Sequence, residues 1–182
     1  MCLVIFAYKV HPKYPLIITA NRDEFYKRPT VKAHWWESHP NLLAGKDLKG
    51  GGTWLGASKS GKFATLTNYR DLRHMRTDAP TRGTLVMDFL LNDEHSAMEY
   101  LDSIQNDEAF NGYNLLLYEN EKLFWHSNIQ GDSQELKPGI YGLSNAQLDT
   151  PWPKVELGKS YLKELITEDS LDFNTEKAFD YL

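Results

Sequence analysis

Cysteine is the scarcest residue of interest in this sequence, with one among 182 residues. One cysteine cannot form an internal disulfide, so the chain suits a reducing compartment and we expect a cytoplasmic protein. No apolar run approaches the length of a membrane-spanning helix, and the apolar start at Leu3–Tyr8 has no basic leader. The chain also has no excess of basic residues, since its net charge is −5. These absences predict a soluble protein with no stable membrane insertion and no nucleic-acid partner.

The composition that remains is that of a globular domain. Apolar residues make up 41% and charged residues 25% of the chain. The length suits one core of good size, and no linker, repeat or low-complexity segment divides it. We therefore expect residues 1–182 to form a single domain. Because the chain ends on the apolar stretch 179–182 without a polar tail, we also expect it to be truncated at its C-terminus.

Short continuous apolar runs predict strands that are covered on both faces. The expected single strands are Leu3–Tyr8, Leu16–Ala20 and Ile140–Ser144. Two hairpins are also expected, Thr53–Ala57 with Lys62–Thr67, and Tyr113–Tyr118 with Lys122–His126. Gly61 in the first hairpin turn can supply a positive φ.

Helical spacing of apolar residues appears between and after these strands. The expected helices lie around residues 85–90, 97–104, 157–166 and 174–182. Thr150 is a candidate N-cap for the third helix, with Pro151 in its first turn. Strands, a helical pair, more strands and then helices predict a layered α+β fold.

Cys2 is the first candidate for chemistry. Methionine is normally removed when the second residue is small, and removal would place a thiol and a free α-amino group on Cys2. A typical α-amino pKa of about 8 and a typical thiol pKa of about 8.5 lie close together. The amine can therefore accept the thiol proton, as in enzymes that use an N-terminal nucleophile. The alternative is that Cys2 simply opens a buried strand as a small hydrophobic residue.

Polar residues at the ends of expected strands are the other candidates. Arg22 and Asp23 follow the strand at Leu16–Ala20, where an arginine could stabilise a thiolate and a carboxylate could orient an ammonium group. Asn68 and Asn145 each end an apolar strand, where an amide can donate to a developing oxyanion. A solvated turn with a surface ion pair, and ordinary turn asparagines, are the alternatives.

Cofactor and metal sites are not indicated. The six histidines show no metal-ligand spacing. Gly56–Lys62 nearly matches a phosphate-binding loop, but Phe63 stands where Ser or Thr is required. The tryptophans Trp35, Trp36 and Trp54 are interpreted as core or pocket walls.

Several motifs spread along the chain carry a family resemblance. They are Met1-Cys2, Ala20-Asn21-Arg22-Asp23-Glu24-Phe25, Arg28-Pro29, Gly51-Gly52-Thr53-Trp54-Leu55-Gly56, Thr67-Asn68-Tyr69-Arg70, Leu143-Ser144-Asn145 and Pro151-Trp152-Pro153-Lys154. With them the sequence resembles the NRDE family, also called the transport and Golgi organisation protein 2 family. More distantly it is similar to cysteine N-terminal-nucleophile hydrolases such as penicillin V acylase and bile salt hydrolase.

The distant similarity implies a four-layer αββα sandwich with a catalytic N-terminal cysteine. It assigns the roles of nucleophile, arginine, carboxylate and two asparagines to Cys2, Arg22, Asp23, Asn68 and Asn145. The hydrolases separate their arginine and carboxylate by two residues, whereas Arg22 and Asp23 are adjacent. Neighbours on a regular strand point to opposite faces, so Glu24 is a rival for the carboxylate role. The hydrolases also use an arginine near their C-terminus, and we expect this chain to end before it.

Two functions follow from the resemblance. The first is an amidohydrolase that uses Cys2 to cleave the carbon–nitrogen bond of a small-molecule amide. The alternative is a non-catalytic binding or trafficking protein on the same fold, related for example to haem or lipid. A haem carrier would need a Cys or His as axial ligand.

Overall fold

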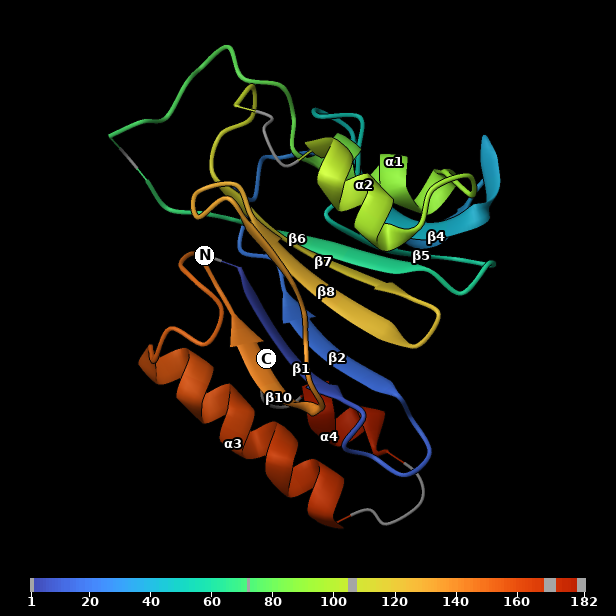
Figure 1. Ribbon diagram of the computed structural model, residues 1–182, viewed down its shortest axis with the longest axis vertical. Coiled ribbons are helices and arrows are strands. Elements are labelled where there is room, and N and C mark those ends of the chain that lie inside the picture. The colour runs from blue at the N-terminus through green and yellow to red at the C-terminus, as the bar shows by residue number, and fades with distance from the viewer. Residues whose placement is uncertain (1, 72, 105–107, 169–172, 180–182) are drawn as a thin grey trace. The chain divides into compact units, whose positions relative to one another are not determined.

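The computed structural model describes residues 2–71, 73–104, 108–168 and 173–179 (Figure 1). The chain divides into two compact units. The first comprises Met1–Glu24 and Lys137–Leu182, and the second comprises Phe25–Leu136. The second unit is therefore inserted between two parts of the first. Whether the two units behave as one domain stays a prediction.

The first unit is a three-stranded antiparallel sheet in the order β10-β1-β2, covered by helices. Its elements are β1 (Leu3–Tyr8), β2 (Leu16–Asn21), β10 (Gly139–Leu143), α3 (Pro153–Glu168) and α4 (Thr175–Phe179). Helix α3 packs on β1 and β10, and its Leu162 joins Ile5, Ala7 and Ile17 in the core. The predicted helix over 174–182 is present as α4, and residues 180–182 lie outside the described part of the chain.

Two glycines let α3 lie close to its sheet. A Cβ added at Gly142 of β10 would be 2.5 Å from a methyl carbon of Val155. A Cβ at Gly158 of α3 would be 2.7 Å from Cγ1 of Ile5. The absence of side chains at these two positions sets the spacing between helix and sheet. It also brings the first turn of α3 close to the N-terminal end of β1.

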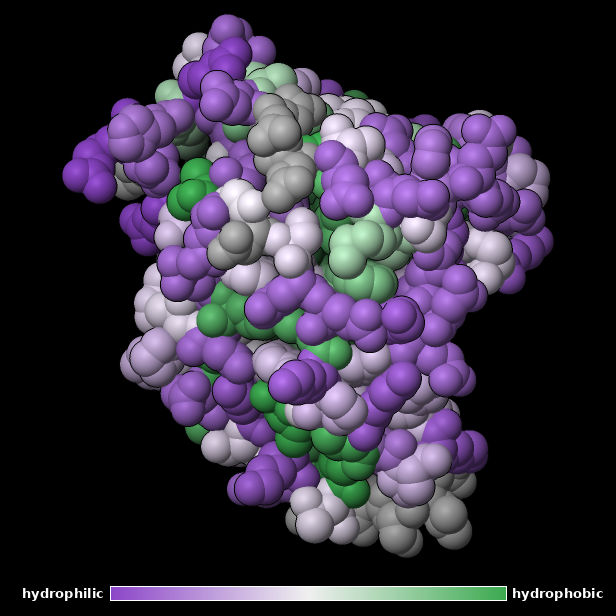
Figure 2. Space-filling view, viewed as in Figure 1, coloured by the Kyte–Doolittle hydropathy of each residue, from purple (hydrophilic) through white to green (hydrophobic). Residues whose placement is uncertain are grey.

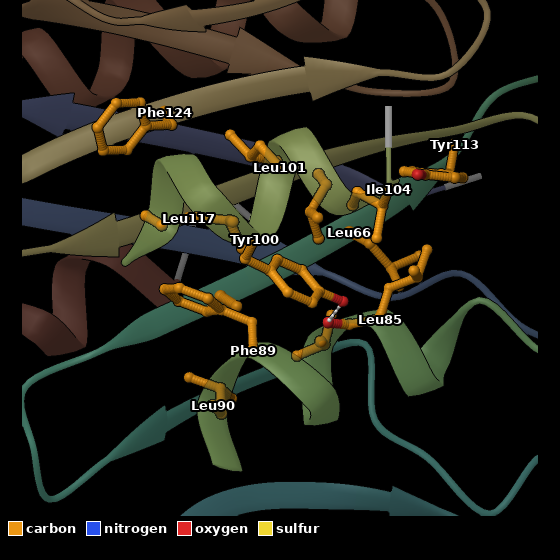
Figure 3. Close-up of a cluster of buried hydrophobic side chains, with 14 of the residues drawn as sticks. Leu66, Leu85, Phe89, Leu90, Tyr100, Leu101, Ile104, Tyr113, Leu117 and Phe124 are labelled. Atoms are coloured by element: carbon orange, nitrogen blue, oxygen red, sulfur yellow. Dashed lines mark hydrogen bonds between the residues drawn. The ribbon is translucent and has the colours of Figure 1, made fainter. Parts of the chain in front are cut away.

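The second unit is a seven-stranded antiparallel sheet in the sequential order β3 to β9. Its elements are β3 (Thr30–Trp36), β4 (His39–Asp47), β5 (Leu55–Ser58), β6 (Phe63–Asn68), α1 (Gly83–Leu91), α2 (Ala97–Ile104), β7 (Tyr113–Glu119), β8 (Lys122–Ser127) and β9 (Asp132–Glu135). Helix α1 packs on β4–β6, and α2 packs on β7 and β8. Figure 3 shows the core between these helices and the sheet, where the Tyr100 hydroxyl donates to the Leu85 carbonyl at 2.8 Å.

All of the predicted strands are confirmed, with small differences in their bounds, and both hairpins form. Gly61 has φ +86° in the first turn, as expected. Strands β3, β4 and β9 were missed. Strands β3 and β9 are the two edges of the sheet, and every residue of β3 except Trp36 is exposed. An exposed edge strand needs no apolar alternation, so its sequence carries no such signal.

The predicted start of α3 was wrong. The helix begins at Pro153, and the Thr150 hydroxyl donates to the Gln147 carbonyl instead of capping the helix. A residue before proline is disfavoured in the helical region, which excludes Trp152 from the helix. Pro153 itself suits the first helical position because its missing N–H would have no partner there.

The three tryptophans differ in their surroundings. Trp36 is buried and its indole N–H donates to the Ala44 carbonyl at 3.0 Å, while Trp54 packs against the core. Trp35 is 48% exposed with the Lys59 ammonium 4.9 Å from its ring centroid, so its interpretation as a core or pocket residue was wrong.

Hydrophilic side chains predominate on the face shown in Figure 2, and the apolar patches there are small. Within the described residues, no helix is long and apolar enough to cross a membrane.

Candidate functional site

Cys2 lies at the N-terminal end of the central strand of the first unit, and its thiol is free. The residue is half-buried. In the ladders beside it, Val4 pairs with Leu143 of β10 and Leu3 pairs with Asn21 of β2. Arg22 directly follows the end of β2, and Asn145 lies two residues after the end of β10. Two of the predicted site residues therefore follow the ends of the strands that pair with β1.

Ser144 connects Cys2 to Asn145. The Ser144 hydroxyl donates to the Cys2 carbonyl oxygen at 2.7 Å and lies 3.3 Å from Oδ1 of Asn145. Both Ser144 and Asn145 are buried. Because the hydroxyl group approaches the amide oxygen of Asn145, the amide nitrogen is the group left to donate elsewhere.

Arg22, Asp23 and Glu24 follow the end of β2 at Asn21, outside the regular strand. Strand alternation therefore does not apply to them, and adjacent side chains can reach the same region. Nη2 of Arg22 lies 3.4 Å from Oε2 of Glu24, so these two form an ion pair. The rival carboxylate is thus engaged by the arginine.

Lys154 is a residue near Cys2 that sequence reasoning missed. Its ammonium group donates to the Cys2 carbonyl oxygen at 3.3 Å from the first turn of α3. The available signal was its place in Pro151-Trp152-Pro153-Lys154, which carried the family resemblance, shortly after the predicted site residue Asn145. No role was assigned to it, because 152 residues separate it from Cys2 and only the packing of α3 shows the contact.

Electrostatics connect Asp23 to the same region. The pKa of Asp23 lies below its ordinary value, because positive charge, first that of the chain terminus and last that of Lys154, outweighs the effect of burial. Asp23 therefore lies in surroundings that favour a carboxylate.

Burial lowers the pKa of Lys154 below its ordinary value, while the charges of Cys2 and Asp23 act to raise it. Lys154 thus lies near enough to Cys2 and Asp23 for both to affect its pKa. The arrangement combines a thiol, a carboxylate and a cation, which are the groups that nucleophilic thiol chemistry needs.

Asn68 belongs to the second unit, whereas Cys2, Arg22, Asp23 and Asn145 belong to the first. It ends β6 opposite Tyr113 and is exposed. Its predicted place near Cys2 stays a prediction. Among the residues that the structure describes, no group of three or more His, Cys, Asp or Glu side chains could hold a metal ion.

The fold is similar to that of a solved Caenorhabditis elegans N-acylethanolamine-hydrolyzing acid amidase ortholog. The similarity has a TM-score of 0.61 at 13% identity and covers 100% of this chain and 85% of that chain. The chain therefore has the fold of an N-terminal-nucleophile hydrolase, and the predicted α+β class is confirmed.

Sequence comparison finds curated relatives that match most of this chain over part of their own length. The Transport and Golgi organization 2 homolog of Mus musculus is 38% identical over 183 residues, covering 92% of this chain and 65% of the relative. The homolog of Homo sapiens is 39% identical over 180 residues, covering 91% and 64%. This chain spans about two thirds of the length of these relatives. A family model described as Transport and Golgi organisation 2 matches residues 1–182, and the chain belongs to that family.

Proposed function

We propose that this chain is a cysteine N-terminal-nucleophile amidohydrolase that cleaves a small-molecule amide. The observation that carries the proposal is the position of Cys2. It lies at the start of a central strand, and its carbonyl oxygen accepts hydrogen bonds from Ser144, the neighbour of Asn145, and from Lys154. The amidase fold similarity supports the reaction class, since the matched protein's name states amide hydrolysis.

In the proposed reaction, removal of Met1 exposes the amine of Cys2. The thiol sulfur attacks the amide carbonyl carbon, and its proton passes to the α-amine. The amine then protonates the departing nitrogen, the carbon–nitrogen bond breaks, and a thioester remains on Cys2. Water attacks the thioester, releases a carboxylic acid and restores the thiol. We assign oxyanion stabilisation to the amides of Asn68 and Asn145.

We assign the carboxylate role to Asp23 in preference to Glu24. Glu24 is paired with Arg22, while the pKa of Asp23 is lowered by the positive charge of the chain terminus. Once Met1 is removed, the role proposed for Asp23 is to hold the ammonium form of the Cys2 amine in place. A thiol that must stay reduced also fits a cytoplasmic location, which fractionation with a tagged chain can check.

Intact mass spectrometry tests the covalent step. Purified protein is weighed before and after incubation with an activated small acyl ester. We expect a mass without Met1, followed by the gain of one acyl group that is lost again by hydrolysis. The Cys2→Ala variant should gain none. A native protein that gains no acyl group, or one that the Ala variant gains equally, would contradict the proposal.

Alkylation kinetics test the environment of the thiol. Cys2 is the single thiol in the chain, so iodoacetamide labelling reports on it alone. We expect faster labelling at neutral pH than for a free thiol. Arg22→Met should slow it by up to about tenfold, because a nearby opposite charge favours the ionised form. An N-terminal extension that blocks removal of Met1 should slow it too.

Arg73→Met is the matched control for charge, since Arg73 is exposed and lies in the second unit. It should leave the rate unchanged. Slow labelling of the native protein, identical in the Arg22 variant and the extended form, would leave Cys2 a buried strand residue and exclude the hydrolase function.

A binding or trafficking role is the second candidate. The curated relatives are named for transport and Golgi organization and not for a reaction, which favours this alternative. The acyl-ester experiment separates the two. A binding protein would be stabilised by a ligand without gaining a covalent acyl group.

A further inference from the structure

The Cys2 carbonyl oxygen is held by two side chains from different elements. The Ser144 hydroxyl reaches it at 2.7 Å from the end of β10, and the Lys154 ammonium reaches it at 3.3 Å from α3. A carbonyl oxygen has two lone pairs and can accept both hydrogen bonds. What distinguishes the second donor is its positive charge, which a hydrogen bond alone does not require.

Three features of the first unit fix Lys154 in this place. Gly142 and Gly158 allow α3 to approach β10 and β1 closely. Pro153 fixes where the helix starts, one residue before Lys154. The Lys154 ammonium also lies 5.5 Å from the ring centroid of Trp152, a cation–π contact that restricts the side chain. The position of the ammonium group is thus set by packing.

Lys154 is also partly removed from water, in the neighbourhood of Cys2 and Asp23. Burial disfavours its charged form, and the charges that favour that form come from Cys2 and Asp23. Arg22, the cation that the sequence predicts for this site, forms an ion pair with Glu24 at 3.4 Å. Because Glu24 offsets part of the positive charge of Arg22, Arg22 stabilises a nearby thiolate less. The Lys154 ammonium group instead donates to Cys2 itself, at the carbonyl oxygen.

We infer that Lys154 is a positioning residue of the Cys2 site, which holds the Cys2 carbonyl group and supplies a positive charge that favours the thiolate over the thiol. This inference rests on the proposed function, because it deepens the role of Cys2 as nucleophile. The charge comes from the first turn of α3.

The test is the rate of iodoacetamide labelling of Cys2 from about pH 5 to 9 in protein that has lost Met1. Lys154→Met should move the labelling profile to higher pH by about one unit, so that labelling at pH 7 slows up to about tenfold. Lys154→Arg, which keeps the charge, should restore most of the native rate. Lys154→Gln keeps an N–H donor for the carbonyl without the charge, and should show the same shift as Lys154→Met.

Lys163→Met is the matched control, because Lys163 lies on the same helix, is exposed, and is about 13 Å farther along the axis. It should leave the profile in place. Thermal unfolding of each variant shows which of them fold, and Lys154→Gln remains informative if Lys154→Met does not.

The outcomes separate this inference from the proposed function. A reactive native thiol whose profile is the same in Lys154→Gln and Lys154→Arg would overturn the role of Lys154 and leave Cys2 as the nucleophile. A native thiol no more reactive than a free one would overturn both. The role of Lys154 is supported if the labelling profile moves to higher pH in Lys154→Gln but stays close to the native profile in Lys154→Arg.

Discussion

Arg28, in the sequence motif Arg28-Pro29, forms an ion pair with Asp47 at the end of β4. Its Nε and Nη2 atoms lie 2.8 and 2.7 Å from Oδ2 of Asp47, a two-pronged ion pair. The other carboxylate oxygen accepts the N–H groups of Lys49 and Gly50. One carboxylate thus fixes the turn that leads into the Gly51-Gly52 motif. The arginine of the Arg28-Pro29 motif therefore has a structural role, which is to hold the carboxylate of Asp47 in this turn.

Asp47→Asn should destabilise the protein by about 1.5–3 kcal/mol, the usual value of hydrogen bonds to a charged group. Burial raises the pKa of Asp47, but the bonds from Arg28, Gly50 and Lys49 outweigh it, so the pKa is lowered. A lowered pKa means that the stabilisation is complete above the unfolded value of about 3.9 and is lost as pH falls through the folded value.

Urea unfolding at several pH values measures this difference. The gap between native protein and Asp47→Asn should be constant from pH 6 to 8 and should shrink below about pH 4. Asp93→Asn, at an exposed position, is the control and should cost little at any pH. A gap for Asp47→Asn that does not change on acidification would mean that the ion pair with Arg28 contributes nothing.

At the scale of elements, the start of α1 touches the segment before β5 through two glycines. A Cβ added at Gly52 would lie 2.6 Å from the carbonyl carbon of Gly83. The Thr53 N–H donates to the Gly83 carbonyl at 3.4 Å. Gly51 differs from its neighbour, because it has φ +75° and open space around it. Adjacent glycines are therefore required for different reasons, one for close packing and one for backbone conformation.

Gly52→Ala should cost about 1–3 kcal/mol because backbone must move to admit the methyl group. Gly51→Ala should cost about 1–2 kcal/mol through its left-handed φ. Asparagine tolerates that conformation, so Gly51→Asn should recover most of the loss while Gly52→Asn should not. Denaturant unfolding of the four variants checks the pattern. Equal recovery at both positions would contradict the close contact with Gly83.

For the whole molecule, the first unit is built from the two ends of the chain. Strand β1 pairs with β2, which follows it in the sequence, and with β10, which comes after the whole second unit in the sequence. Closing a loop of that length costs conformational entropy before the β1–β10 pairing can offset it. The first unit should therefore depend on the folding of the inserted unit.

Calorimetry tests this dependence. If residues 1–182 act as the single domain that we expect, heating should give one transition whose calorimetric and van't Hoff enthalpies agree. The Gly52→Ala variant should keep one transition at a lower temperature, although its change lies in the second unit. Two separate transitions, with only one moved by Gly52→Ala, would show that the units unfold independently.

The sequence by itself determined the strands and helices whose apolar residues repeat with the right period. Strands β1, β2, β5, β6, β7, β8 and β10 and all four helices were predicted from it. It also drew attention to Cys2, Arg22, Asp23 and Asn145, because polar residues at strand ends are a local pattern. These features depend on neighbours within a few residues, which a sequence shows directly.

Only the tertiary structure decided what depends on distant residues. Strands β3 and β9 exist because neighbouring strands offer hydrogen bonds, whatever the polarity of their own side chains. The pairing of Arg22 with Glu24 depends on the bend after β2. Lys154 reaches Cys2 because Gly142 and Gly158 let α3 lie close to the sheet. Such contacts arise from packing between elements far apart in the chain, and no local pattern of residue types encodes them.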